Sequence, residues 1–133
     1  MNVLAVALVA SALLAAPAAT ATTGPSFAFG RAGGNIVPAS VVIAANGRVT
    51  VNGQYRRMLS RARLQALLEV ALAQRFFALP RKIVCPNQLP DFATLYVTVR
   101  TGTRARTVTQ RGNCNKRFIR VYDALSSAMG STL

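Results

Sequence analysis

The chain of 133 residues contains no histidine and no tryptophan, and only three of its residues are acidic. Without histidine it cannot build a Ser-His-Asp triad, a Cys-His dyad or a zinc site with histidine ligands. Glu69, Asp91 and Asp123 are also too few and too widely spaced to surround a calcium ion. We therefore expect no catalytic residue, no cofactor and no metal, and a protein that is not an enzyme. A small hydrolase that uses Asp91 or Glu69 is the alternative.

Near the N-terminus, the sequence has an apolar run that is too short for a comfortable membrane span. Residues 3–16 are Val, Leu and Ala interrupted only by Ser11, whereas a spanning helix needs about 20 residues. Small residues follow at 16–21, and this order is typical of a secretory signal peptide. Cleavage fits after Ala18 or after Ala21, and we favour Ala21.

These observations divide the chain into three parts. Residues 1–21 are the predicted signal peptide, 22–26 a short polar linker and 27–133 a single small domain. The protein is then secreted, extracellular or attached to the cell envelope, and its mature form has no transmembrane span. Met1 and Asn2 supply none of the positive side chains usual before a signal's apolar run. An uncleaved anchor or a buried core helix is the alternative.

The two cysteines, Cys85 and Cys114, are widely separated and form no Cys-x-x-Cys motif. In an exported protein, such a pair is most simply a structural disulfide. Closing a loop of this size stabilises a fold by about 3–4 kcal/mol in the chain-entropy model. A reactive thiol pair that acts as a redox switch is the alternative interpretation.

Glycine-containing turns between β-branched runs predict several strands. An Asn-Gly pair between two such runs is the strongest short-range indication of a hairpin. The glycine loop at 31–35 lacks the Lys-Ser/Thr ending of a phosphate-binding loop, so we expect a turn there. The resulting predictions are a strand at 27–30, a hairpin around Asn46-Gly47, a turn at Asn52-Gly53, an irregular segment at 81–91 and a hairpin around 101–103 whose return strand ends near Gln110.

Two amphipathic helices complete the predicted fold. The first covers about 60–75 with Ser60 as its N-cap. The second begins after Asn113 or Asn115, carries an apolar stripe as far as Met129 and ends at Gly130. The predicted fold class is therefore α+β, with two layers: antiparallel β-hairpins with both α-helices on one face, in the order hairpin-helix-hairpin-helix.

The net charge is +13, and fourteen of the sixteen basic residues are arginine. An exported protein of this charge meets anionic envelope polymers and lipid headgroups, and we expect no specific nucleic-acid partner. With a three-residue loop, Tyr96 and Arg100 would share an exposed sheet face with Arg104 and Arg106, forming an anion-binding surface. A two-residue loop would reverse the return strand. Alternatively, the arginines only keep the surface soluble.

A second hypothesis is that the chain inhibits another secreted protein or forms a subunit of an extracellular complex. In that case the Gly33-Gly34 loop, or the proline-containing segment around Cys85, would insert into the partner. Salt separates the two hypotheses, because binding to a polyanion weakens steeply as salt rises.

Several short motifs resemble a group of small exported proteins from high-GC Gram-positive bacteria. No activity is assigned to that group, so the resemblance implies no catalytic or binding residue. It implies export, the disulfide and a compact α+β domain. The motifs are FGRAGGN at 29–35, Asn46-Gly47, FFALP at 76–80, Cys85-Pro86 followed by Leu89-Pro90-Asp91, and VYDAL at 121–125.

Overall fold

A computed structural model of the chain describes residues 24–86 and 91–130. The predicted signal segment 1–21, its cleavage position at Ala21 and the first two linker residues lie outside the described residues. The elements in chain order are β1 (Ser26–Ala32), β2 (Ala39–Ile43), β3 (Arg48–Val51), β4 (Gln54–Met58), α1 (Arg61–Ala73), the 3-10 turn η1 (Phe76–Ala78), β5 (Lys82–Val84), β6 (Thr94–Thr101), β7 (Arg104–Arg111) and α2 (Lys116–Ala128).

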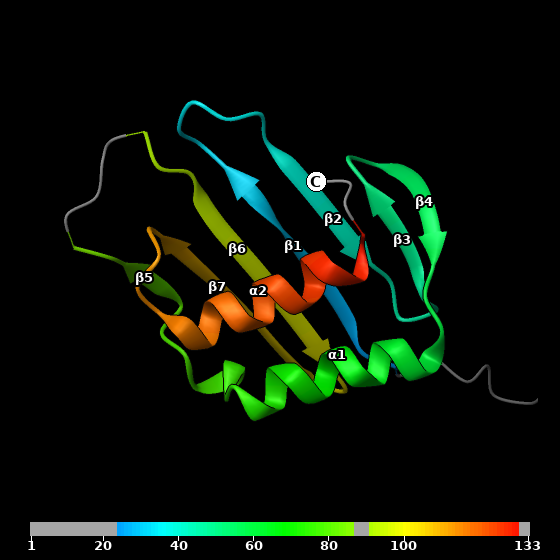
Figure 1. The fold of residues 1–133 in the computed structure, drawn as a ribbon. Coiled ribbons are helices and arrows are strands. Elements are labelled where there is room, and N and C mark those ends of the chain that lie inside the picture. Colours follow the sequence, from blue (N-terminus) through cyan, green and yellow to red (C-terminus); the bar gives the residue numbers. More distant parts are fainter. Residues whose placement is uncertain (1–23, 87–90, 131–133) are drawn as a thin grey trace, which may run out of the picture.

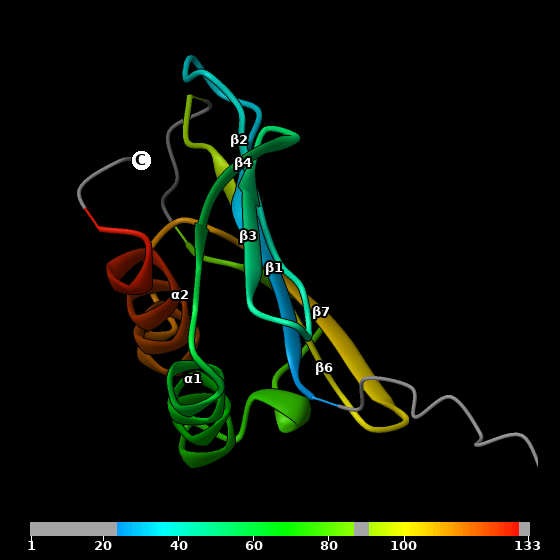
Figure 2. The ribbon, with the colours of Figure 1, turned by 90° about the vertical axis from the view of Figure 1, so that its right-hand side faces the viewer.

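The seven strands form one sheet in the order β4-β3-β2-β1-β6-β7-β5 (Figure 1). Neighbouring strands are antiparallel except for β5, which runs parallel to β7. Both helices lie on the same side of this sheet (Figure 2). We call that side the helix face and the other side the open face. The predicted α+β class is confirmed, and the sheet is mixed rather than wholly antiparallel.

The core lies between the helix face and the two helices. The rings of Phe29 from β1 and Tyr122 from α2 meet edge to face, with their centroids 5.7 Å apart. The Tyr122 ring also stacks on Phe118, with a centroid distance of 6.3 Å. Val97 and Val108 from the neighbouring strands are fully buried in the same cluster. Because strand side chains alternate, their neighbours Ala28, Tyr96 and Thr107 fall on the open face.

Local capping signals set where the helices begin. The hydroxyl of Ser60 accepts a hydrogen bond from the Arg63 amide at 3.2 Å, which confirms the predicted cap. At α2, the side-chain oxygen of Asn115 accepts from the Phe118 amide at 3.1 Å, so Asn115 rather than Asn113 is the cap. Gly130 follows α2 with a left-handed φ of 72°.

Arginines from distant parts of the chain cap the C-terminal ends of both helices. Arg117 donates to the carbonyls of Gln74 at 2.7 Å and Arg75 at 2.9 Å, just after α1. Arg57 of β4 donates to the Ala128 carbonyl at 3.1 Å, at the last residue of α2. A cation at this end of a helix also interacts favourably with the helix dipole. Part of the positive charge therefore has a structural role.

Neither edge strand was predicted. The segment 81–91 was expected to be irregular, but Lys82–Val84 pairs with β7 and forms β5. On the other edge, Gln54–Met58 pairs with β3 through a two-residue turn at Asn52 and Gly53, whose φ values are 49° and 80°. Left-handed values at both central positions are those of a type I′ turn. All five residues of β4 and two of the three in β5 are exposed. Neither strand therefore needs the alternating apolar pattern by which a sequence reveals a half-buried strand.

A β-bulge in β4 separates the directions of its side chains. Tyr55 pairs with Thr50 and Arg57 pairs with Val49, which leaves Arg56 as the extra residue. In a regular strand, Tyr55 and Arg57 would point to the same face. The bulge instead places Tyr55 on the open face with Thr50, and Arg57 on the helix face, where it reaches α2.

No helix in the two described ranges, 24–86 and 91–130, is long and apolar enough to cross a membrane.

Candidate functional site

The register of the β6–β7 hairpin decides where the predicted anion-binding residues lie. Thr101 pairs with Arg104, so the loop consists of only Gly102 and Thr103. Consequently Arg100 pairs with Ala105, and Arg106 pairs with Val99, whose side chain is buried in the core. The loop thus has two residues rather than three, and the prediction that the four residues share one face is wrong. Tyr96 and Arg100 lie on the open face, whereas Arg104 and Arg106 start from the helix face.

On the open face, Tyr96 is part of a cross-strand hydrogen-bond network. Its hydroxyl donates to the Ser40 hydroxyl at 3.1 Å, across β1. This approach requires the glycine at position 30, because a Cβ there would lie 2.9 Å from the Tyr96 hydroxyl and 2.0 Å from the Ala39 carbonyl. Thr98 and Thr107 share a further hydrogen bond of 2.7 Å. The half-buried Tyr96 thus has a defined structural role in the sheet.

Arg106 is half-buried and holds the 3-10 turn η1 against the sheet. Two of its guanidinium nitrogens, Nε and Nη2, donate to the carbonyl oxygen of Leu79. Leu79 itself is fully buried. The structure therefore explains the charge at position 106 by a backbone contact.

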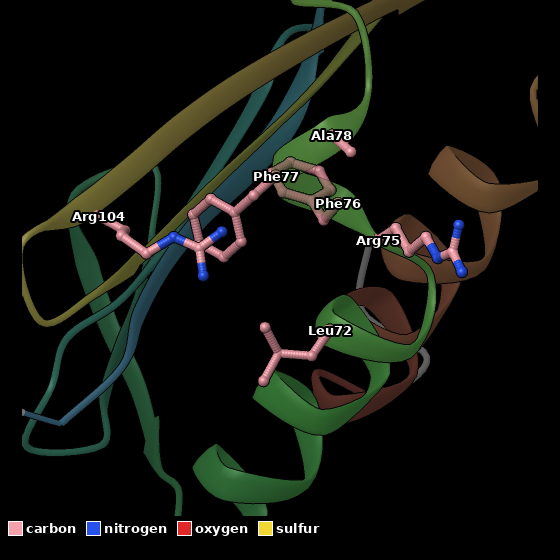
Figure 3. Close-up of a pocket in the computed structure, with 6 residues that line it drawn as sticks. All are labelled: Leu72, Arg75, Phe76, Phe77, Ala78 and Arg104. Carbon is pink, nitrogen blue, oxygen red and sulfur yellow. The ribbon is translucent and has the colours of Figure 1, made fainter.

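Arg104 is exposed and lies beside an open apolar pocket (Figure 3). Its guanidinium carbon is 4.1 Å from the centroid of the Phe77 ring. Leu72 points toward the same opening from α1, whereas the Arg75 side chain points away from Arg104. We call this opening, of about 280 Å³, the Arg104 pocket; its lining residues are Leu72, Arg75, Phe76, Phe77, Ala78 and Arg104.

The stacking geometry leaves the guanidinium able to bind an anion. An arginine that lies on an aromatic ring uses the face of its planar group, and its five N–H donors point outward along the edge. Phe77 and the exposed Leu72 offer apolar surface next to those donors. The Arg104 pocket is therefore suited to a ligand that joins an anionic group to an apolar one. The sequence singled out neither Leu72 nor Phe77, because apolar residues in or next to an amphipathic helix usually pack into the core.

The three carboxylates lie on separate parts of the chain in the described structure. Glu69 on α1, Asp91 before β6 and Asp123 on α2 are all exposed. Over residues 24–86 and 91–130, no cluster of three or more His, Cys, Asp or Glu could hold a metal ion.

Burial raises the pKa of the Tyr122 phenol, an effect that the nearby charge of Arg31 partly offsets. Tyr122 thus stays neutral at physiological pH and behaves as a core ring.

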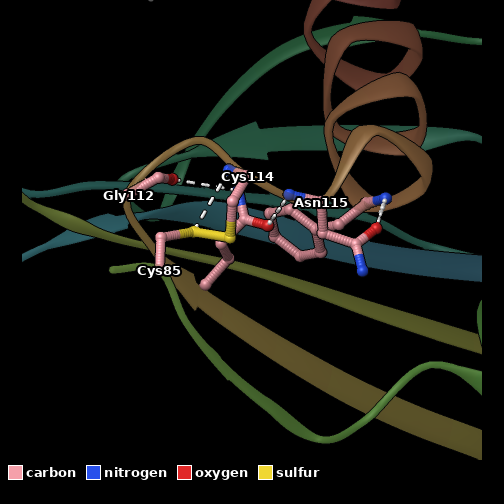
Figure 4. The surroundings of a disulfide bond; sticks show 6 residues. Cys85, Gly112, Cys114 and Asn115 are labelled. Carbon is pink, nitrogen blue, oxygen red and sulfur yellow. Dashed lines mark hydrogen bonds between the residues drawn. A yellow bond between two sulfur atoms is a disulfide. The ribbon is translucent and has the colours of Figure 1, made fainter. Parts of the chain in front are cut away.

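The predicted disulfide is confirmed. Cys85 and Cys114 are bonded with an S–S distance of 2.02 Å, and the bond joins the end of β5 to the start of α2 (Figure 4). The Cys114 amide also donates to the Cys85 sulfur at 3.1 Å. This bond secures the short edge strand β5 to the rest of the domain.

Next to the disulfide lies Gln110, which is fully buried. Its side-chain NH₂ donates to the Gly112 carbonyl at 3.0 Å, and its oxygen accepts from the Asn115 amide at 3.2 Å (Figure 4). The amide group therefore satisfies two backbone groups in the turn between β7 and α2. Both partners flank Cys114, so Gln110 and the disulfide order the same turn.

We expect Gln110→Leu to lower the free energy of unfolding by about 2 kcal/mol, because the Gly112 carbonyl and the Asn115 amide would lose their partners inside the protein. Urea denaturation followed by circular dichroism measures this change. Gln65→Leu, at an exposed position of α1, is the matched control and should change stability by less than about 0.5 kcal/mol. Equal effects of the two variants would contradict the structural role of Gln110.

The Arg104 pocket is thus a surface feature in which a cation and apolar side chains lie together. No protein-family model matches the chain, and no curated protein is significantly similar to it.

Proposed function

We propose that this is an exported, non-enzymatic binding protein whose partner is an anionic lipid surface of the cell envelope. Its net charge of +13 favours association with any anionic surface. The signal-like segment 1–21 and the Cys85–Cys114 disulfide support export, because structural disulfides persist in oxidising compartments. The mature chain would then begin after Ala21.

The observation that carries this proposal is the position of Arg104 on the Phe77 ring, at the edge of the Arg104 pocket. A lipid at the surface of a bilayer combines a phosphate with apolar chain segments. The phosphate would accept hydrogen bonds from the guanidinium, and the apolar segment would contact Phe77 and Leu72. A hydrophilic wall polymer would use the charge but not the apolar surface.

We expect the purified protein to co-sediment with phosphatidylglycerol vesicles at about 50 mM salt and to dissociate at about 500 mM. Arg104→Gln should weaken binding about fivefold, since one cation at an anionic membrane contributes on the order of 1 kcal/mol. Arg100→Gln removes the same charge from the same hairpin but on the open face, so its effect should be less than about twofold.

Two outcomes would refute this proposal. Equal losses for Arg104→Gln and Arg100→Gln would mean that only the net charge matters. Tight binding to purified cell wall, with none to the vesicles, would identify a wall polymer as the partner instead. Leu72→Gln provides a further test, because it should weaken vesicle binding without changing the charge.

A second candidate function is that the chain inhibits another secreted protein or assembles with it. Exposed apolar side chains at one end of the sheet support this function. Gly34 packs closely on the segment that precedes β6, where a Cβ at this position would lie 2.3 Å from the Asp91 carbonyl oxygen. Ile36, Val37 and Phe92 are all exposed at these two adjoining segments. An apolar end of this kind would support a contact with a protein that salt does not weaken.

A further inference from the structure

The open face carries an exposed apolar patch over strands β2, β3 and β4. Val42, Tyr55 and Met58 are exposed by 46%, 51% and 57%. Large side chains that are exposed singly are common, but adjoining ones mark interaction surfaces.

The strand register places Val42, Tyr55 and Met58 on the same face of the sheet. Val42 pairs with Thr50, and Thr50 pairs with Tyr55. The side chains of Val42, Thr50 and Tyr55 therefore form one row across the open face. Arg48 pairs with Met58, and its guanidinium lies 4.5 Å from the centre of the Tyr55 ring. We call Val42, Arg48, Tyr55 and Met58 the β4 patch.

This patch adjoins the free edge of the sheet. Among the strands of residues 24–86 and 91–130, β4 is the last in the sheet order, and β3 is its one neighbour (Figure 1). An edge strand presents unpaired N–H and C=O groups that can bind a further strand. All five residues of β4 are exposed to solvent, although the Arg48 guanidinium of β3 lies over the Tyr55 ring and Arg57 contacts the end of α2.

The two faces of β4 differ in character. On the open face, Tyr55 and Met58 are apolar. On the helix face, Arg57 is cationic, and the bulged Arg56 adds a further charge. A strand that pairs with this edge would have apolar side chains beside Tyr55 and Met58, and acidic side chains beside the arginines. Alternating acidic and apolar residues are thus the complementary pattern.

We propose that β4 binds an extended acidic segment of another protein, which adds to the sheet as an eighth strand and rests its apolar side chains on the β4 patch. Charge complementarity selects this partner. A second copy of the chain would bring another +13 charge and a second set of arginines to the same edge. The bulge and the charges of β4 also discourage pairing with uncharged apolar strands.

The test uses the purified protein and a short end-blocked peptide that alternates Glu and Val, with a Lys-Val peptide as its control. At a peptide concentration of about ten times Kd, amides of β4 should exchange with deuterium about tenfold more slowly. Those of β5, the edge strand on the opposite side, should not change. The Lys-Val peptide should not bind.

Matched variants locate the contact. Met58→Ala should weaken binding of the Glu-Val peptide about tenfold, as truncation of an interface anchor does. Leu72→Ala removes an exposed apolar side chain from α1 and should have no effect. Arg104→Gln should also leave peptide binding unchanged, so this proposal and the vesicle proposal fail independently.

Four results would overturn the proposal. They are absence of peptide binding at about 50 mM salt, equal binding of the Lys-Val peptide, protection confined to elements other than β4, and a dimer of the protein alone that protects β4 by itself. The last result would identify a second copy as the occupant of the edge.

Discussion

Replacing Phe118 with alanine is expected to lower the free energy of unfolding by about 4 kcal/mol, the usual cost of truncating a fully buried phenylalanine. Phe118 has no exposed surface and lies in the first turn of α2. It stacks on Tyr122, which in turn meets Phe29 of the central strand. The substitution would therefore loosen the attachment of α2 to the sheet.

Urea denaturation at neutral pH measures this loss, and Phe92→Ala is the matched control. Phe92 is 47% exposed, so its truncation should cost less than about 1 kcal/mol. A loss below about 1 kcal/mol for Phe118→Ala as well would show that α2 is not anchored through this ring. A small domain has a total stability of only about 5–15 kcal/mol, so the expected loss is a large fraction of the whole.

Removing the disulfide, by reduction or by replacing both Cys85 and Cys114 with alanine, should lower the free energy of unfolding by about 3–4 kcal/mol. The two cysteines are 29 positions apart, and the loop they close contains the whole β6–β7 hairpin. Without the bond, the unfolded chain gains conformational freedom, and β5 loses its covalent link to the start of α2 while keeping its short pairing with β7.

Two measurements check the expected role of the disulfide. Urea denaturation with and without reductant gives the change in free energy, and hydrogen exchange shows where protection is lost. We expect β5 to lose more protection than β1, which is hydrogen-bonded to strands on both sides. A loss below about 1 kcal/mol, or uniform loss across the sheet, would contradict this account.

Features that depend on neighbouring residues could be predicted from the sequence. The periodicity of 60–75 and the Ser60 cap predicted α1, and the structure has a helix at Arg61–Ala73. The turn at Asn52-Gly53 was predicted for the same reason, since its left-handed conformation depends on those two residues. The two cysteines were predicted to be bonded because a widely spaced pair in an exported protein is most simply a structural disulfide, and the structure has this bond.

Features that depend on pairing between strands could not be predicted in this way. β4 and β5 are strands because β3 and β7 supply hydrogen-bond partners, and their own residues show no alternation. The β6–β7 loop has two residues, whereas the predicted anion-binding face required three. This difference of one residue places Arg104 and Arg106 on the opposite face of the sheet from Tyr96 and Arg100.

The sequence alone determined the α+β class, the helices with one of their caps, the disulfide and the excess of arginine. Only the tertiary structure decided what each arginine does. Arg57 lies 71 positions from Ala128, and Arg117 lies 43 positions from Gln74, so no local pattern predicts these contacts. A guanidinium can cap a helix, stack on a ring or stay in solvent, and the choice depends on which carbonyls and rings the fold brings near it.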